Sequence, residues 1–402
     1  MGEFQSFPAG IRTRSEPVPI EVHRTAEGKF VSLNLLPNGS LVPRGDAAPE
    51  GEVAVGFDGK FATQGLIDLQ VNGFDGLDFN RGEITGEQLD QALVSLAKTG
   101  VTALLPTIIT GSPHRMVSTL RELDKAVSTS RLGPHMVVGY HIEGPFLSPK
   151  DGFSGAHNGS HMTAADLVLV DQLQAVSSRK IKLVTIAPEV DGAIEIIQAL
   201  TERGTQVAIG HSAANADQIS AAVEAGARLC THLGNGLPQM LHKTDNPIFW
   251  QLADDRLTAM FIADGIHVPL PALQTMLRAK GPLRTILTTD AVAAAGHSMW
   301  PGPYTLGDAA IELAEDRSVR IPGSRYLAGS SVTMDQMVRN MAVWFDQTVP
   351  NLLQLMRENP LRFISDQHEA VPLGATDGVV EWETRSDEWF VSNTHIGPFT
   401  IE

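Results

Sequence analysis

The chain has 402 residues, of which 43% are hydrophobic, enough for one large domain or two smaller ones with a substantial core. Its 46 acidic against 30 basic residues give a formal charge of −16, which argues against a nucleic acid or an anionic membrane as the main partner. The single cysteine, Cys230, excludes an intramolecular disulfide and a cysteine-rich metal site, and it suits a reducing compartment.

Residues 1–62 are rich in proline, glycine and charged side chains, and short β-favouring runs at 29–36 and 51–57 lie between turn residues. This pattern predicts the N-terminal part of a small β domain. From Gly65 onward, short apolar runs alternate with amphipathic segments, which is typical of βα units around a parallel sheet.

Residues 85–100 carry the signals of a helix with defined ends. Thr85 and Gln88 form a capping-box pattern, leucines recur at helical spacing, and Gly100 stands where a C-cap belongs. The apolar run 101–107 that follows predicts a strand. This is the first clear helix and strand of the alternation.

The same alternation continues and gives eight candidate strands. They lie within residues 65–73, 101–107, 135–145, 180–189, 205–212, 227–236, 257–265 and 284–291. Because eight parallel strands close a barrel, we predict a (β/α)8 TIM-like barrel over residues 63–362. The alternating segment 378–393 predicts that residues 363–402 complete the small β domain.

Polar residues come just after five of these strands: Glu143, His211, His232, Asp264 with His267, and Asp290. Glu143, His211 and His232 are the candidate metal ligands among them. The C-terminal ends of parallel barrel strands meet at one face, so we expect these side chains to lie together. One carboxylate and two imidazoles suit Zn²⁺ or a similar divalent ion, with a coordination position left for water. Any one histidine alone is more often a hydrogen-bonded structural residue, but matching positions favour a metal site.

Asp290 is then placed to take a proton from a metal-activated water and return it to a leaving nitrogen. An aspartate at this position also serves as a helix N-cap, so the residues alone leave both roles open. Two amides, Gln70 and Asn72, share one face at the end of the first strand, where hydrogen bonding that fixes the loop would explain them structurally.

Eight motifs occur in order over residues 65 to 341. They are GLIDLQVNG, HIEGPFLSP, GAHN, GHSAA, THLGNGLP, IADGIHV, TTDAVAAAG and LAGSSVTMDQMVRN. With them the chain resembles the N-acetylglucosamine-6-phosphate deacetylases of the amidohydrolase superfamily. The resemblance implies a (β/α)8 barrel with a small β-sandwich assembled from both termini.

The resemblance also implies a metal content. Most amidohydrolases carry His-x-His at the end of the first strand to bind a second metal, whereas one branch of this family has Gln-x-Asn, which Gln70 and Asn72 match. It therefore implies one divalent metal per chain, held by Glu143, His211 and His232. Zn²⁺ is the first candidate, and Fe²⁺, Mn²⁺ and Co²⁺ are the alternatives.

By the same resemblance, Asp290 matches the family's general base and acid. Positions that contact the substrate in the family match His157, Asn235, Gly236 and His267, although each also fits a structural role in a loop. The family has an arginine that reaches across a dimer interface to the substrate phosphate. Here Lys243 takes its place, and a lysine binds phosphate without the bidentate fork of arginine.

The resulting hypothesis is a metal-dependent deacetylase of amino-sugar catabolism that converts N-acetylglucosamine 6-phosphate to glucosamine 6-phosphate and acetate. The alternatives are a related substrate, such as N-acetylgalactosamine 6-phosphate or an unphosphorylated sugar, and a non-catalytic sugar-binding barrel. A homodimer is implied by the resemblance alone. Since the sequence has neither a run of about 18 apolar residues nor a signal-peptide pattern, we expect a cytoplasmic protein without a membrane partner.

Overall fold

The computed structural model describes residues 61–296, 298–365, 378–386 and 388–402, together with the backbone of 11–13, 18–24, 29–35, 41–43 and 60. The predicted β-favouring run at 51–57 lies outside these residues. Among the described residues, no helix combines the length and the apolar content needed to cross a membrane.

Parallel strands form a barrel, hydrogen-bonded in the order β15-β14-β13-β12-β11-β10-β9-β6. Their bounds are β6 Leu66–Val71, β9 Val101–Ile109, β10 Tyr140–Glu143, β11 Ile181–Ile186, β12 Gln206–Ile209, β13 Leu229–Cys230, β14 Thr258–Phe261 and β15 Thr285–Leu287. A bridge between Val71 and Ala291 joins the two ends of this order. The predicted barrel is confirmed, and every strand overlaps its predicted range.

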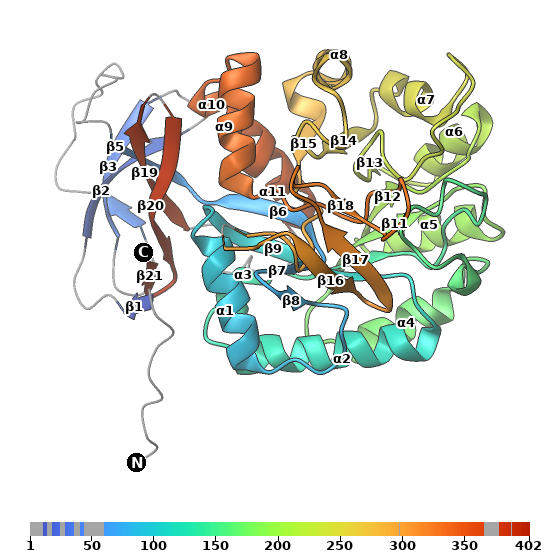
Figure 1. Cartoon of the computed structure of the whole chain (residues 1–402), viewed down its shortest axis with the longest axis horizontal. Coiled ribbons are helices and arrows are strands. Elements are labelled where there is room, and N and C mark those ends of the chain that lie inside the picture. The colour runs from blue at the N-terminus through green and yellow to red at the C-terminus, as the bar shows by residue number, and fades with distance from the viewer. Residues whose placement is uncertain are drawn as a thin grey trace.

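Helices surround the barrel, as Figure 1 shows. They are α1 Gly86–Ala97, α2 Pro113–Thr129, α3 Gly133–Met136, α4 Leu167–Ala175, α5 Ala193–Glu202, α6 Ala216–Glu224, α7 Pro247–Ala253, α8 Leu270–Lys280, α9 Met334–Phe345, α10 Val349–Leu353 and α11 Asn359–Ile364. Short turns of other helix types occur at η1 Gly159–His161, η2 Pro282–Arg284 and η3 Gln354–Glu358. One apolar cluster draws most of its members from barrel strands and includes the fully buried Ile67, Leu105 and Met260.

The start of α1 shows how the local sequence sets an element. The backbone N–H of Gln88 donates to Oγ1 of Thr85 at 3.2 Å, and the backbone N–H of Thr85 donates to Oε1 of Gln88 at 3.0 Å. This is the predicted capping box, which satisfies two backbone donors that the first helical turn cannot. The helix then buries Leu89 and Leu93 against the barrel core.

Both termini contribute strands to a second sheet, with the order β1-β21-β20-β19-β5-β2-β3-β4. The bounds are β1 Ile11–Thr13, β2 Val18–Arg24, β3 Lys29–Leu35, β4 Leu41–Pro43, β5 Lys60–Gln64, β19 Val379–Arg385, β20 Glu388–Ile396 and β21 Phe399–Ile401. β19 pairs antiparallel with β5, and it lies beside the barrel in Figure 1. The predicted joining of the two termini is confirmed, whereas the exact domain limits remain predictions.

An inserted sheet follows the last barrel strand and was not predicted. Its strands, β16 Gly302–Leu306, β17 Ala309–Leu313 and β18 Val319–Arg320, pair antiparallel. Leu306 and Ile311 pack with Val292 in a separate apolar cluster, against which Ile109 at the end of β9 also packs. The inserted sheet therefore lies close to the C-terminal strand ends. A small ribbon of β7 Gly73–Phe74 and β8 Leu77–Asp78 follows β6.

Candidate active site

Three site residues adopt a backbone conformation that residues with side chains seldom take. His211, His232 and Asp290 have φ angles of 49°, 24° and 51°. Each lies two or three positions beyond the end of its barrel strand. Positive φ at a non-glycine residue is uncommon, and the surrounding structure must hold it in place. Such positions gather at functional sites, and here they carry predicted ligands and the predicted base.

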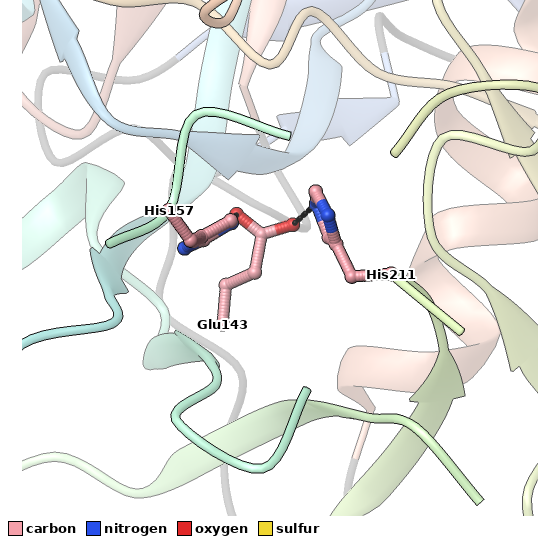
Figure 2. Close-up of side chains that lie close together, drawn as sticks. All are labelled: Glu143, His157 and His211. Atoms are coloured by element: carbon pink, nitrogen blue, oxygen red, sulfur yellow. Dashed lines mark ion pairs between the residues drawn. The ribbon is translucent and has the colours of Figure 1, made fainter. Parts of the chain in front are cut away.

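Glu143, the last residue of β10, lies between histidines (Figure 2). Nε2 of His157 is 3.5 Å from Oε2 of Glu143, and Nε2 of His211 is 3.5 Å from Oε1. Nε2 of His232 is 3.1 Å from the same Oε1. These side chains are only 3 to 6% exposed. The structure thus brings the three predicted ligands together, and it adds His157.

The donor atoms of Glu143, His157 and His211 lie within 4.8 Å of one another, as a metal site requires. Nδ1 of His211 is 2.9 Å from the carbonyl oxygen of Phe153, so Nδ1 carries the proton and Nε2 keeps its lone pair. Among the described residues, the buried Nδ1 atoms of His157 and His232 have no hydrogen-bond partner. This donor set fits a divalent ion.

The pKa shifts of Glu143 and His211 suit metal binding, whereas the shift of His232 favours its protonated form. Burial, together with repulsion from His157, lowers the pKa of His211 to about 4. Burial raises the pKa of Glu143, but hydrogen bonds from the histidines outweigh it and hold the pKa well below the usual range. Burial lowers the pKa of His232, but the hydrogen bond and charge of Glu143 outweigh it, so this pKa is raised. An ionised carboxylate beside a neutral imidazole is the form that binds metals.

The two amides after the first strand each engage a carboxylate. Nε2 of Gln70 donates to Oε1 of Glu143 at 2.9 Å, and Nδ2 of Asn72 donates to Oδ1 of Asp290 at 2.7 Å. Within the described part of the chain, Oε1 of Gln70 and Oδ1 of Asn72 are buried without a hydrogen-bond partner. The amides therefore orient the two acidic groups of the site.

Asp290 is a buried carboxylate with an unusual pKa. Burial raises this pKa to about 6, and the attraction of His232 opposes the rise. A carboxylate that titrates near neutral pH is suited to accept and return a proton. The hydrogen bond from Asn72 occupies Oδ1.

One cavity of about 380 Å³ contains most of the predicted site residues, and its size is ordinary for a small-molecule site. Its walls include Asn72, Glu143, His157, His211, His232, Asn235, Gly236, His267 and Asp290. Gln70 does not line the cavity but donates a hydrogen bond to Glu143, which does. Lys243 does not line it, and its side chain is exposed in the loop before α7.

The predicted substrate contacts are held in place by their neighbours. Gly236 has φ 63°, and a Cβ atom there would lie 2.6 Å from Nδ1 of His211, so only glycine fits. Nδ2 of Asn235 donates to the carbonyl of His232 at 3.1 Å. Nδ1 of His267 is 2.6 Å from Oδ2 of Asp264, which fixes the imidazole ring at the cavity wall.

Further polar residues were not predicted from the sequence. Asp68 accepts hydrogen bonds from Oγ1 of Thr288 and of Thr289, both at 2.6 Å, and so ties β6 to the segment that leads to Asp290. His141 is buried on β10, with Nε2 2.8 Å from Oγ1 of Thr185. Asp68 and His141 each lie two residues before a predicted site residue on the same strand. Residues two apart on a strand share one face, and this spacing was the signal that could have found them. Arg320 and Arg325, from the inserted sheet and the turn after it, also line the cavity, and no motif pointed to them.

No known protein-family profile matches the chain. The N-acetylglucosamine-6-phosphate deacetylase of Lysinibacillus sphaericus is 34% identical over 301 residues, which are 75% of this chain and 76% of that relative. The human N-acetylglucosamine-6-phosphate deacetylase is 34% identical over 70% of this chain and 69% of its own. The N-acetylgalactosamine-6-phosphate deacetylase of Escherichia coli O157:H7 is 32% identical over 76% and 79%.

Similar solved structures point to the same family as the sequence relatives do. A mutant N-acetyl-D-glucosamine-6-phosphate deacetylase from Mycobacterium smegmatis, in complex with N-acetyl-D-glucosamine 6-phosphate, is 26% identical, with a TM-score of 0.80 over 95% of this chain and 98% of that one. The Thermotoga maritima N-acetylglucosamine-6-phosphate deacetylase has a TM-score of 0.77 over 96% and 98%, and at 21% identity it supports the fold alone. The chain is therefore an amidohydrolase-type deacetylase and belongs to the N-acetylglucosamine-6-phosphate deacetylase family.

Proposed function

We propose that this protein removes the acetyl group from N-acetylglucosamine 6-phosphate and releases glucosamine 6-phosphate and acetate. The observation that carries the proposal is one cavity that combines Glu143, three histidines around it and Asp290. The relatives named for this substrate add support, as does the solved relative in complex with it.

One divalent metal ion fits the site, with Glu143, His211 and His232 as its ligands and His157 beside them. Zn²⁺ suits a set of carboxylate and imidazole donors, and Fe²⁺, Mn²⁺ and Co²⁺ are the alternatives. When bound, such an ion polarises an amide carbonyl and acidifies a water molecule. Gln70 and Asn72 are poor ligands for a second ion, because the neutral oxygen of an amide binds a transition metal far more weakly than an imidazole nitrogen does.

Asp290 moves the proton in this proposal. It accepts a proton from the attacking water as the water oxygen bonds to the acetamide carbon. It then donates that proton to the sugar nitrogen as the carbon–nitrogen bond breaks, so the sugar leaves as the amine. The new carboxyl group keeps the water oxygen and its second proton, which is released when the acid ionises to acetate. Asn72 holds the carboxylate by its hydrogen bond to Oδ1 during both transfers.

The remaining cavity residues bind the substrate. We assign His157 and His267 to the sugar, and Asn235 with Gly236 to the phosphate end. Lys243 lies outside the cavity of its own chain, so it would reach a substrate only from a partner subunit in a homodimer. The homodimer and the cytoplasmic location are part of this proposal.

A second candidate substrate is N-acetylgalactosamine 6-phosphate. The observation that favours it is the 32% identity to a deacetylase named for that compound, close to the 34% found for the relatives named for the gluco sugar. The two sugars differ only in the configuration of one hydroxyl group, so both carry the same acetamide and phosphate.

The test is acetate release by Zn²⁺-loaded protein, with the metal counted per chain, from N-acetylglucosamine 6-phosphate, N-acetylgalactosamine 6-phosphate and free N-acetylglucosamine. We expect the highest kcat/KM on the first compound and one metal per chain. A higher kcat/KM on the galacto compound selects the second candidate. A lack of acetate release from both phosphorylated sugars by metal-loaded protein contradicts the proposed substrate.

A further inference from the structure

A phosphorylated substrate needs a cation near this cavity. The chain has a formal charge of −16, and the divalent ion of the proposed function would only offset the two carboxylates of the cavity, Glu143 and Asp290, which leaves no surplus positive charge for a phosphate. Lys243 lies outside it. Among the described residues, the lysines and arginines that line the cavity are Arg320 and Arg325.

The two arginines differ in what they already bind. Nε of Arg320 donates to Oγ of Ser318 at 2.9 Å, and its Nη2 lies 3.5 Å from Oδ2 of Asp316. The side chain of Arg325 is exposed and makes no hydrogen bond or ion pair within the described part of the chain. Arg325 therefore presents an uncommitted guanidinium group to the cavity.

The turn that carries Arg325 is held by hydrogen bonds. The backbone N–H of Ser324 donates to the carbonyl of Ile321 at 2.9 Å, and the backbone N–H of Tyr326 donates to Oγ of Ser324 at 3.1 Å. A bridge between Arg320 and Leu327 closes the base of the turn. Because the backbone is already ordered, binding costs the rotamer entropy of the side chain but no further ordering of the turn.

The same segment is joined to the proposed general base. The backbone N–H of Ser330 donates to the carbonyl of Asp290 at 2.9 Å, and the backbone N–H of Val292 donates to the carbonyl of Ser330 at 3.1 Å. Arg325 lies five residues before Ser330 on this chain segment. The backbone that carries Arg325 is therefore joined to Asp290 within one chain, and its side chain extends from this segment to the cavity wall.

We propose that Arg325 is a specificity-determining residue that binds the phosphate of the sugar substrate from within the same subunit. The inference rests on the proposed function, because it names the group that recognises the phosphate of that substrate. A guanidinium group pairs with phosphate through two parallel hydrogen bonds, which a lysine cannot form. Selectivity for phosphorylated over free sugar then comes from the turn at 320–327.

The test compares the Zn²⁺-loaded wild type with Arg325→Gln, Arg325→Lys and Lys243→Gln, which removes the competing cation, on N-acetylglucosamine 6-phosphate and on free N-acetylglucosamine. Arg325→Gln should raise KM for the phosphorylated sugar by roughly 10- to 100-fold with kcat retained, as expected when a hydrogen bond between charged groups is lost from binding. Its kcat/KM on the free sugar should stay at the wild-type value. Arg325→Lys should recover part of the loss, and Lys243→Gln should change KM less than Arg325→Gln.

A second measurement does not depend on turnover. Calorimetry gives the Kd of glucosamine 6-phosphate and of glucosamine for the same proteins, with thermal melting to verify that each is folded. If the wild type fails to hydrolyse either phosphorylated sugar, the proposed function fails, yet a weaker Kd for glucosamine 6-phosphate in Arg325→Gln still supports the inference. The inference is overturned if the wild type and Arg325→Gln have equal KM and Kd for the phosphorylated sugars. It is also overturned if Lys243→Gln weakens phosphate binding more than Arg325→Gln does.

Discussion

Nδ2 of Asn72 donates a 2.7 Å hydrogen bond to Oδ1 of Asp290, although the two residues are 218 positions apart. Asn72 directly follows β6, and Asp290 lies just beyond β15, at opposite ends of the barrel strand order. The bond therefore spans the seam where the barrel closes, next to the bridge between Val71 and Ala291. Closure of the fold and orientation of the proposed base thus depend on the same few residues.

Removal of this hydrogen bond should reduce turnover. In Asn72→Ala the carboxylate of Asp290 loses its orienting donor, and we expect kcat to fall roughly 10-fold, in the range of a hydrogen bond to a charged group. The metal content should stay at the wild-type level. Steady-state kinetics and elemental analysis measure both. The matched control is Asn393→Ala, which removes an amide donor to Glu381 in the terminal sheet; an equal loss in both variants contradicts the assigned role.

Asp290→Asn should abolish most hydrolysis while it leaves the metal bound. The amide has nearly the same shape but cannot accept the proton, so we expect kcat to fall by about 10²- to 10⁴-fold. Single-turnover acetate release and metal analysis on the same sample test this. Turnover close to that of the wild type would remove Asp290 from the mechanism.

His211→Ala should lose metal. His211 supplies a neutral imidazole whose other nitrogen is tied to the carbonyl of Phe153, so the variant lacks a preorganised donor. We expect the zinc content after dialysis to drop to a small fraction of that in the wild type. His114→Ala, at an exposed position on α2, should keep the full content. Unchanged zinc in His211→Ala would show that the ligand assignment is wrong.

Ionisation of the Asp264 carboxyl should make the free energy of unfolding depend on pH below about 4. Burial raises its pKa, but the hydrogen bonds and charge of His267 outweigh burial, so the pKa lies below the usual 3.8. A depressed pKa stabilises the fold above the unfolded value, and this contribution is lost as the pH falls through the folded pKa. Urea unfolding from pH 7 to 3 should therefore show the difference between the wild type and Asp264→Asn shrinking towards acid. If the difference in the free energy of unfolding stays constant down to pH 3, the pKa of Asp264 is not lowered in the folded protein.

The thiol of Cys230 should resist alkylation in the folded protein. The residue is fully buried, and burial raises the pKa of the thiol to about 12. At pH 8 only about one thiol in 10⁴ would be ionised, and the thiolate is the reactive form. We expect no iodoacetamide adduct by mass spectrometry in native protein and complete modification in urea. Rapid modification without denaturant would contradict this burial.

Local patterns were sufficient where an element is defined by its own residues. The barrel strands are short apolar runs between turn signals, and α1 begins at a capping box that needs only Thr85 and Gln88. The inserted sheet escaped prediction because its strands, such as β16 and β17, alternate between buried and exposed residues over only five positions. Such a mixed run of apolar and polar residues is a weaker signal than the continuous apolar runs of the barrel strands.

The sequence by itself determined the barrel and the residues at its strand ends, because apolar periodicity and the chemistry of Glu143, His211 and Asp290 are local properties. Only the tertiary structure decided which of them meet. It set His157 beside Glu143, joined Asn72 to Asp290, and placed Arg325 at the cavity but Lys243 outside it. The physical reason is that these contacts depend on barrel closure and on the paths of loops between distant strands, and no short segment encodes either.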